Sequence, residues 1–446
     1  MILLYQTLKR SKNGLRKQLE AVINYIKSGE KLKEEFTVGM EMEHFIIDKD
    51  TLKTVSYFGE NGVGETLREL HEGGCVAYKE GEYILGLEND DLAVSTEPGS
   101  QFEVALSSKW NIDELKDIYI KNMRKLVEVF DKKNQAMVTL GYHPVTKIDE
   151  IKILPKKRYD FMYKYFNERG DMAHNMMKGT CSLQCSIDYS SEEDFIKKYK
   201  ICNCLSPVFY TLFDNAYIFE GNPAKSRNMR EIIWENTDTD RSGMYPFSFD
   251  DDLSYKKYAE NILNTPLIFS IDENHEPYYV GKTTFKEVFE DVRDTDLIFH
   301  ALSIVFPDVR AKRYIEIRMM DEIKYPLNFS AVALIKGLFY DDTNLDKLSE
   351  LFKNMTYESC MKAKLDAREK GLDATFMNVN MLEFCKMLVD MAKAGLPANE
   401  IGYLIPLEEM LEKGMNPRDV FEQIYKEKGL REAVVANEIK LEDLDV

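Results

Sequence analysis

The sequence predicts an α+β fold in which helices flank an antiparallel sheet. Four short runs alternate polar with apolar side chains, which is the pattern of half-buried strands. Segments with helical spacing lie before, between and after these runs, and beyond Leu327 strand signals become few. We therefore expect a mixed α+β body at residues 1–328 and a helical C-terminal region at residues 329–446, packed together as one structural unit.

Each element follows from a local pattern. Apolar side chains recur at helical intervals in the first helix, as at Leu15, Leu19 and Val22, and Ser190 with Glu193 forms a capping box that opens another helix. The expected helices are 14–28, 66–72, 113–133, 190–215, 328–340, 344–353, 375–395, 405–413 and 417–427. The expected strands are 38–45, 101–107, 181–189 and 313–319.

Composition narrows the class of protein. The chain has 446 residues, 44% of them hydrophobic, which is enough for a buried core. Its 59 basic and 77 acidic residues give a net charge of −18, which disfavours nucleic acid and anionic membranes as partners. Seven scattered cysteines without a CxxC pair indicate free thiols, and no signal peptide or membrane anchor is apparent. We expect a cytoplasmic monomer or homodimer that binds small molecules.

Glutamates gather on the polar faces of the four strands. In VGMEMEHF (38–45) two of them point to the same side, because strand side chains alternate between faces. The carboxylates on or beside the four faces are Glu41, Glu43, Glu97, Glu103 and Glu316, and Gln184 and Arg318 accompany them. For any single glutamate a solvated sheet face is the commoner explanation. The set as a whole holds one balancing cation, Arg318.

If these strands share a sheet, the carboxylates converge and raise one another's pKa unless cations bind between them. Oxygen ligands without a His or Cys cluster suit hard ions such as Mg²⁺ or Mn²⁺, which commonly also take phosphate oxygens. The pattern therefore predicts a metal site. The segment GENGVGET (59–66) has the glycine spacing of a phosphate-binding P-loop, but Glu65 stands where the lysine belongs and would repel phosphate. His44 lies on the strand face opposite the glutamates, so we expect it to be a structural residue and not a metal ligand.

Five segments in chain order resemble the glutamate–cysteine ligases of the plant and proteobacterial type. They are VGMEMEHF (38–45), STEPGSQFEVALS (95–107), KGTCSLQCSIDY (178–189), EGNPAKSRNMREIIWENTDTDRSGMYPF (220–247) and VFPDVRAKRYIEIRMMD (305–321). The resemblance implies a curved antiparallel sheet that forms a funnel, with the catalytic fold of glutamine synthetase. It also implies ligation of L-glutamate to L-cysteine with ATP, the first step of glutathione biosynthesis. The γ-carboxylate would first be phosphorylated to γ-glutamyl phosphate, which the amine then attacks.

The resemblance also assigns roles to residues. It makes Glu41, Glu43, Glu97, Glu103 and Glu316 magnesium ligands, with Gln184 beside them at the substrate. Arg318 would stabilise the transferred phosphoryl group, because a planar guanidinium suits its oxygens. Arg230 is the candidate for the glutamate α-carboxylate, and Arg241 is a second candidate for substrate binding. Without the resemblance, a surface ion pair is the preferred explanation for both arginines.

Departures from the family pattern lie near the substrate end of the expected pocket. Ser186 stands where the family has Asn, and Ser100 where it has Gly. The acceptor amine therefore stays open, and a sister ligase that joins glutamate to another amine is an alternative. A non-catalytic nucleotide-binding homologue and a metal-dependent phosphohydrolase are two more. If the protein is a ligase of either kind, Glu41→Gln and Glu316→Gln should each lose most activity. The fold should be kept or stabilised, since repulsion among the carboxylates is relieved.

Overall fold

The computed structural model describes residues 2–272, 274 and 276–445, and its centre is a nine-stranded sheet with the order β14-β15-β7-β1-β5-β4-β3-β2, in which β6 also pairs with β1. Every pair of neighbours in this sheet is antiparallel, which confirms the α+β class. The strands are β1 (Val38–Asp48), β2 (Val76–Glu80), β3 (Tyr83–Glu88), β4 (Leu92–Thr96), β5 (Phe102–Lys109), β6 (Gln135–Val138), β7 (Leu183–Ile187), β14 (Val309–Ala311) and β15 (Ile315–Ile317).

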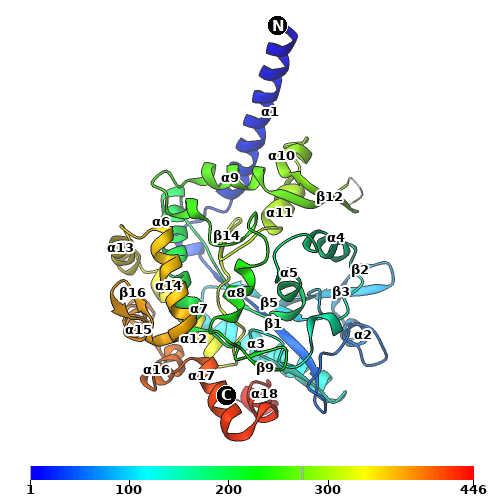
Figure 1. The fold of residues 1–446 in the computed structure, drawn as a ribbon, viewed down its shortest axis with the longest axis vertical. Coiled ribbons are helices and arrows are strands. Elements are labelled where there is room, and N and C mark those ends of the chain that lie inside the picture. Colours follow the sequence, from blue (N-terminus) through cyan, green and yellow to red (C-terminus); the bar gives the residue numbers. More distant parts are fainter. Residues whose placement is uncertain (1, 273, 275, 446) are drawn as a thin grey trace.

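Helices precede, interrupt and follow the sheet strands. In the first 326 residues they are α1 (Ile2–Lys27), α2 (Val63–Glu72), α3 (Ile112–Asp131), α4 (Lys157–Phe166), α5 (Ala173–Gly179), α6 (Glu192–Cys204), α7 (Ser206–Leu212), α8 (Met229–Glu235), α9 (Tyr255–Asn264), α10 (Phe285–Val288) and α11 (Thr295–Ser303). The C-terminal helices are α12 (Leu327–Phe339), α13 (Asp342–Leu351), α14 (Tyr357–Lys370), α15 (Met381–Gly395), α16 (Ile405–Glu412), α17 (Pro417–Lys428) and α18 (Leu430–Ala436). Figure 1 shows α1 projecting from the body, with α16, α17 and α18 at the opposite end.

Four small two-stranded sheets complete the fold. They are β8 (Ile218–Phe219) with β9 (Asn222–Pro223), β10 (Ser242–Gly243) with β13 (Phe306–Pro307), β11 (Pro266–Ile271) with β12 (Pro277–Thr284), and β16 (Thr375–Phe376) with β17 (Val379–Asn380). Within the described part of the chain, no helix combines the length and apolarity that a bilayer crossing needs.

The apolar face of the sheet is covered by helices, which leaves the polar face for the site. Met40 and Met42 of β1 are buried, as α12 packs against β1 and β7 and α3 packs against β5. Every residue of α12 from Asn328 to Phe339 is buried. Because successive strand residues point to opposite faces, burial of the methionines directs the intervening glutamates to the other side.

All four predicted strands are confirmed, although two are shorter than expected. Several helix boundaries differ from the sequence prediction, and the first predicted helix, 14–28, begins at Ile2 in the structure. The capping residue of α6 is Ser191, whose Oγ accepts from the Asp194 N–H, and the predicted long helix ends at Cys204 because Pro207 opens a separate helix, α7. The segment predicted as helix 375–395 begins as the β16–β17 hairpin. Eight helices were not predicted: α4, α5, α8, α9, α10, α11, α14 and α18.

Candidate active site

The register of the sheet brings the predicted carboxylates together. Glu41 of β1 lies opposite Gln184 of β7 on one side, and Glu43 of β1 lies opposite Glu103 of β5 on the other. On the far side of β5, Glu103 lies opposite Ser95 of β4. Since paired residues share a face of the sheet, these side chains converge on the polar face.

A pocket lies over this face, and six of the nine predicted site residues line it: Glu41, Glu43, Glu97, Glu103, Gln184 and Arg318. The remaining wall comes from α4, α11 and the segments around β11, β13 and β14, and it consists of Arg158, Tyr159, Met162, Phe269, His300, Ser303, Ile304, Phe306 and Arg310. Acidic residues of the sheet therefore face arginines and apolar side chains across one cavity.

Neutral groups are the hydrogen-bond partners of the pocket carboxylates. Glu43 Oε2 accepts from the Ser182 N–H at 2.7 Å and the Ser182 Oγ at 3.0 Å, and Gln184 Nε2 donates to Oε1 at 3.3 Å. Ser95 Oγ donates to Glu103 at 2.9 Å, and the Tyr159 hydroxyl donates to Glu97 at 3.3 Å.

Cations are missing from these contacts. Among the residues that the structure describes, no lysine or arginine forms an ion pair with Glu41, Glu43, Glu97 or Glu103. This leaves a buried negative charge that a bound cation could balance.

The same arrangement shifts the pKa of these groups. Burial, with the nearby Glu97 charge, raises the pKa of Glu43 from 4.5 to about 7. Burial also raises the pKa of Glu41, where Glu316 adds repulsion, and raises that of Glu103, where Glu97 and Glu41 add theirs. The pocket thus favours a bound positive charge, either protons or a metal cation.

Glu316 differs from the other four carboxylates. It lies on β15 opposite Arg310 of β14, and its carboxylate pairs with Arg310, with Lys312 Nζ at 2.8 Å and with Arg318 Nη1 at 3.7 Å. Although burial alone would raise it, the cations Arg310, Lys312 and Arg318 hold the pKa of Glu316 far below its usual range. In the described ranges, no three His, Cys, Asp or Glu side chains form a ready metal-binding group, so the ligand set remains a prediction.

Arg318 lines the pocket, and its predicted role at the phosphoryl group stays a prediction. Its Nη1 donates to Gln184 Oε1, and both residues line the pocket. Burial, with repulsion from Arg310, lowers the pKa of Arg318 to about 10. Gln184 therefore connects Glu43 to Arg318, because its amide donates to one and its carbonyl accepts from the other.

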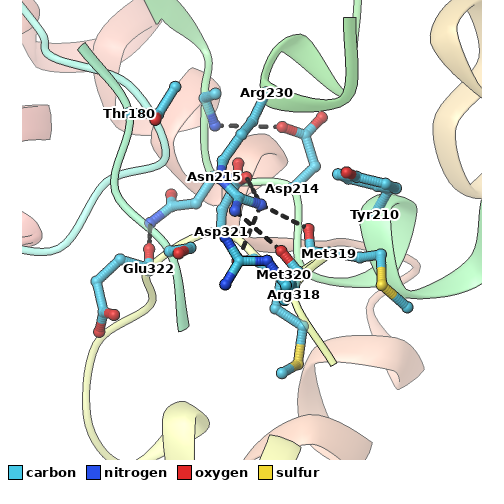
Figure 2. A network of polar contacts seen from close by, with 12 residues as sticks. Thr180, Tyr210, Asp214, Asn215, Arg230, Arg318, Met319, Met320, Asp321 and Glu322 are labelled. Atoms are coloured by element: carbon cyan, nitrogen blue, oxygen red, sulfur yellow. Dashed lines mark hydrogen bonds and ion pairs between the residues drawn. The ribbon is translucent and has the colours of Figure 1, made fainter. Parts of the chain in front are cut away.

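The structure does not bring Arg230 and Arg241 to the pocket. Arg230 of α8 is buried and donates to the carbonyls of Arg318 at 2.9 Å and Met319 at 3.0 Å (Figure 2). Arg241 is also buried; it pairs with Asp238 at 2.7 Å and donates to the Ile304 carbonyl at 3.0 Å. The alternative of surface ion pairs is wrong, since both guanidinium groups are occupied inside the protein.

Sequence reasoning missed two arginines of the pocket. Arg158, at the start of α4, donates to the Tyr159 hydroxyl at 3.2 Å and forms no ion pair among the described residues. Arg310 donates to the Ser303 carbonyl at 3.0 Å while it pairs with Glu316. The run KKRYDF gave a weak signal for Arg158, but basic residues at a helix start are more often solvated.

An antiparallel sheet with acidic and cationic side chains around one pocket defines a site for a small charged molecule. The chain belongs to glutamate–cysteine ligase family 2 (GCS2), whose model matches residues 37–437. It is 29% identical over 425 residues to the chloroplastic glutamate–cysteine ligase of Arabidopsis thaliana, covering 91% of this chain and 79% of the relative. It is 27% identical over 424 residues to the chloroplastic glutamate–cysteine ligase B of Oryza sativa subsp. japonica, covering 92% and 85%.

The fold is also similar to a solved structure. The crystal structure of the glutamate–cysteine ligase of Francisella tularensis in complex with AMP matches with a TM-score of 0.57 and 10% identity, over 94% of this chain and 90% of that one. At this identity the likeness shows the fold alone. It confirms the prediction of a glutamine synthetase-like catalytic fold.

Proposed function

We propose that the protein is an ATP-dependent carboxylate–amine ligase that joins the γ-carboxylate of L-glutamate to the amine of L-cysteine. The products would be γ-glutamylcysteine, ADP and phosphate, which is the first step of glutathione biosynthesis. One observation carries the proposal: four half-buried carboxylates without an ion-pair partner among the described residues share one pocket with three arginines. Membership of GCS2 and the names of the plant relatives support it.

The residues present fit a divalent cation. Glu41, Glu43, Glu97 and Glu103 supply hard oxygen ligands, and Glu316 adds a fifth carboxylate nearby. The pKa values of Glu41, Glu43 and Glu103 are raised, which reflects missing positive charge. Mg²⁺, or Mn²⁺, bound there would neutralise phosphate oxygens of ATP. The protein's own part is to hold these carboxylates on a rigid sheet, where their geometry is set before substrate arrives.

The arginines would bind the substrate anions. Phosphorylation of a carboxylate brings two anions together, and fixed guanidinium donors lower the repulsion between them. Arg318 and Arg310 pair with Glu316 and would hold the transferred phosphoryl group, whereas Arg158 lines the same pocket without an ion pair among the described residues and would bind a carboxylate of glutamate. Gln184 would orient Arg318. Arg230 and Arg241 would act from outside the pocket, through the backbone they hold.

The acceptor amine is tested by product analysis. Purified protein is given ATP and Mg²⁺ with glutamate alone, then with glutamate and each of several amines including cysteine, while ADP release and product mass are recorded. ADP release that requires both amino acids, with γ-glutamylcysteine as product, is the expected result. A different preferred amine would indicate a sister ligase, and ATP turnover indifferent to glutamate would indicate a phosphohydrolase.

Two further expectations belong to this proposal. A cytoplasmic location is supported by the seven cysteines, all of which are free thiols. The relatives are named as chloroplastic, so the compartment can differ within the family. A monomer or homodimer remains the expected assembly.

A further inference from the structure

We propose that Lys364 of α14 and Arg230 of α8 are positioning residues that fix the backbone of Arg318 from its two sides. This would make α14 part of the catalytic apparatus, although none of its residues lines the pocket. The inference rests on the proposed function only for what Arg318 does. The arrangement that fixes Arg318 can be tested without turnover.

Both backbone polar groups of Arg318 are bound. Its N–H donates to the Asp308 carbonyl at 3.1 Å, and its carbonyl accepts from Arg230 Nη2 at 2.9 Å. Figure 2 shows the Arg230 guanidinium directed at the carbonyls that follow Arg318, and Nη1 donates to Met319 at 3.0 Å. With both groups held, the Cα–Cβ bond of Arg318 has one direction, and the guanidinium reaches Gln184 in the pocket.

The hydrogen bond from the Arg318 N–H to Asp308 depends on α14, because a side chain of this helix holds Asp308. The Asp308 carboxylate accepts from Lys364 Nζ at 2.6 Å, from Ser206 Oγ at 2.6 Å and from the Tyr210 hydroxyl at 3.0 Å. Lys364 is fully buried and Asp308 is almost so. A buried ion pair with this many hydrogen bonds allows little freedom of position, so the carbonyl of Asp308 is held with its side chain.

The hydrogen bond from Arg230 to the Arg318 carbonyl depends on the same helix, because α14 also holds the neighbour of Arg230. Glu231, the neighbour of Arg230 on α8, accepts two hydrogen bonds from Arg368 of α14, each at 2.7 Å. Lys364 Nζ also lies 3.7 Å from Glu231 Oε1. Two cations one turn apart on α14 therefore tie down the carboxylates on both sides of Arg318, and a shift of α14 would move its guanidinium.

The test variant removes the pair without leaving a buried charge. Lys364→Met alone would strand the Asp308 carboxylate and could unfold the protein, so Lys364→Met is combined with Asp308→Asn. Ser206 and Tyr210 donate to different oxygens of Asp308, so the amide can accept from one hydroxyl through its oxygen and donate to the other through its NH2. Lys370→Met is the matched control, because Lys370 lies on the same helix in an exposed pair with Asp366. Circular dichroism and thermal melting establish that all three proteins fold.

Two readouts separate a positioning role from a structural one. Deuterium exchange at the Arg318 amide should be faster in the double variant and unchanged in Lys370→Met. In the ligase assay kcat should fall about 10- to 100-fold with KM for ATP unchanged, as expected when a group is misplaced only for the transition state. Unchanged exchange at Arg318, or faster exchange with wild-type kcat, would overturn the inference.

The two proposals fail in different ways. If wild-type protein ligates no amine to glutamate, the proposed function fails, yet the exchange at Arg318 still decides whether α14 holds this residue. If wild-type protein is active and the folded double variant matches it in both readouts, the positioning role of Lys364 is wrong and the proposed function stands.

Discussion

Glu43 on β1 and Glu103 on β5 lie directly opposite each other in the sheet. Like charges in this position destabilise a sheet, and here each carboxylate receives hydrogen bonds from neutral groups only. Both carboxylates are half-buried and line the pocket, so a positive charge bound beside them would relieve their repulsion.

Divalent cations should stabilise the wild-type protein. Binding to the folded state alone raises the free energy of unfolding by about 2.7 kcal/mol when the cation is at 100 times its dissociation constant. Thermal melting with Mg²⁺, with Mn²⁺ and with EDTA measures this effect. The Tm rise should be lost in Glu43→Gln combined with Glu103→Gln. An equal rise in the double variant would show that the cation binds elsewhere.

Glu41→Gln should keep the fold and lose activity. Its carboxylate has no hydrogen-bond or ion-pair partner among the described side chains, so the neutral amide relieves repulsion and should raise the free energy of unfolding by up to about 1 kcal/mol. Ligase turnover should fall at least about 100-fold, because a fixed charge at the reacting group is lost. Glu88→Gln, at an exposed position of β3, is the control. Near-normal turnover at saturating Mg²⁺ would contradict the metal assignment of Glu41.

Glu316→Gln should instead destabilise the protein, against the expectation from sequence. Its carboxylate compensates Arg310, Lys312 and Arg318, and removing one partner from a buried ion cluster costs about 3–5 kcal/mol. Denaturant unfolding of Glu316→Gln and Glu41→Gln in parallel measures the contrast. Equal stability of the two variants would mean that the cluster around Glu316 is weaker than its geometry indicates.

Arg158→Met should weaken substrate binding. The methionine keeps the apolar stem at the wall of the pocket and removes the guanidinium, which forms no ion pair among the described residues. We expect kcat/KM for glutamate to fall about 10- to 100-fold, since a hydrogen bond to a charged group contributes roughly 1.5–3 kcal/mol. Arg293→Met, in an exposed pair with Asp291, should leave the kinetics unchanged. A wild-type KM in Arg158→Met would remove Arg158 from the binding site.

Asp321 should make stability fall as pH rises. Burial, with repulsion from Asp214, raises the pKa of Asp321 from 3.8 to about 8, although Arg230 Nη1 lies 4.0 Å away. Between these values the folded state holds a proton that the unfolded state releases, so the free energy of unfolding decreases with increasing pH. In Asp321→Asn this decrease should be smaller between about pH 5 and pH 8. If the free energy of unfolding changed with pH equally in wild type and Asp321→Asn across this range, the raised pKa of Asp321 would be contradicted.

The strand faces could be predicted from the sequence because side-chain alternation depends on the local pattern alone. The glutamates of β1 and β5 were placed correctly on one face for this reason. The partners of Glu316 could not be predicted, since the chain turns between Ala311 and Ile315 and pairs Arg310 with Glu316 across the hairpin. Treating 313–319 as one strand concealed that turn.

The sequence also did not show which polar side chains are buried and what they bind. Arg230 and Arg241 could be identified as unusual, but only the packed structure shows that backbone carbonyls occupy them. Helix α14 was missed because its buried face consists of small residues and Lys364, which give little apolar periodicity. The hairpin at residues 375–380 was missed because its turn places Met377 at a positive φ of 51°, which few non-glycine residues adopt.

The most direct measurement follows an oxygen atom. Glutamate labelled with ¹⁸O in its γ-carboxylate is turned over with ATP, Mg²⁺ and cysteine, and the released phosphate is analysed by mass. Activation of the carboxylate by phosphorylation predicts that one labelled oxygen appears in phosphate for each amide bond formed. ADP release with unlabelled phosphate would contradict the central claim, because ATP would then be consumed without activating glutamate.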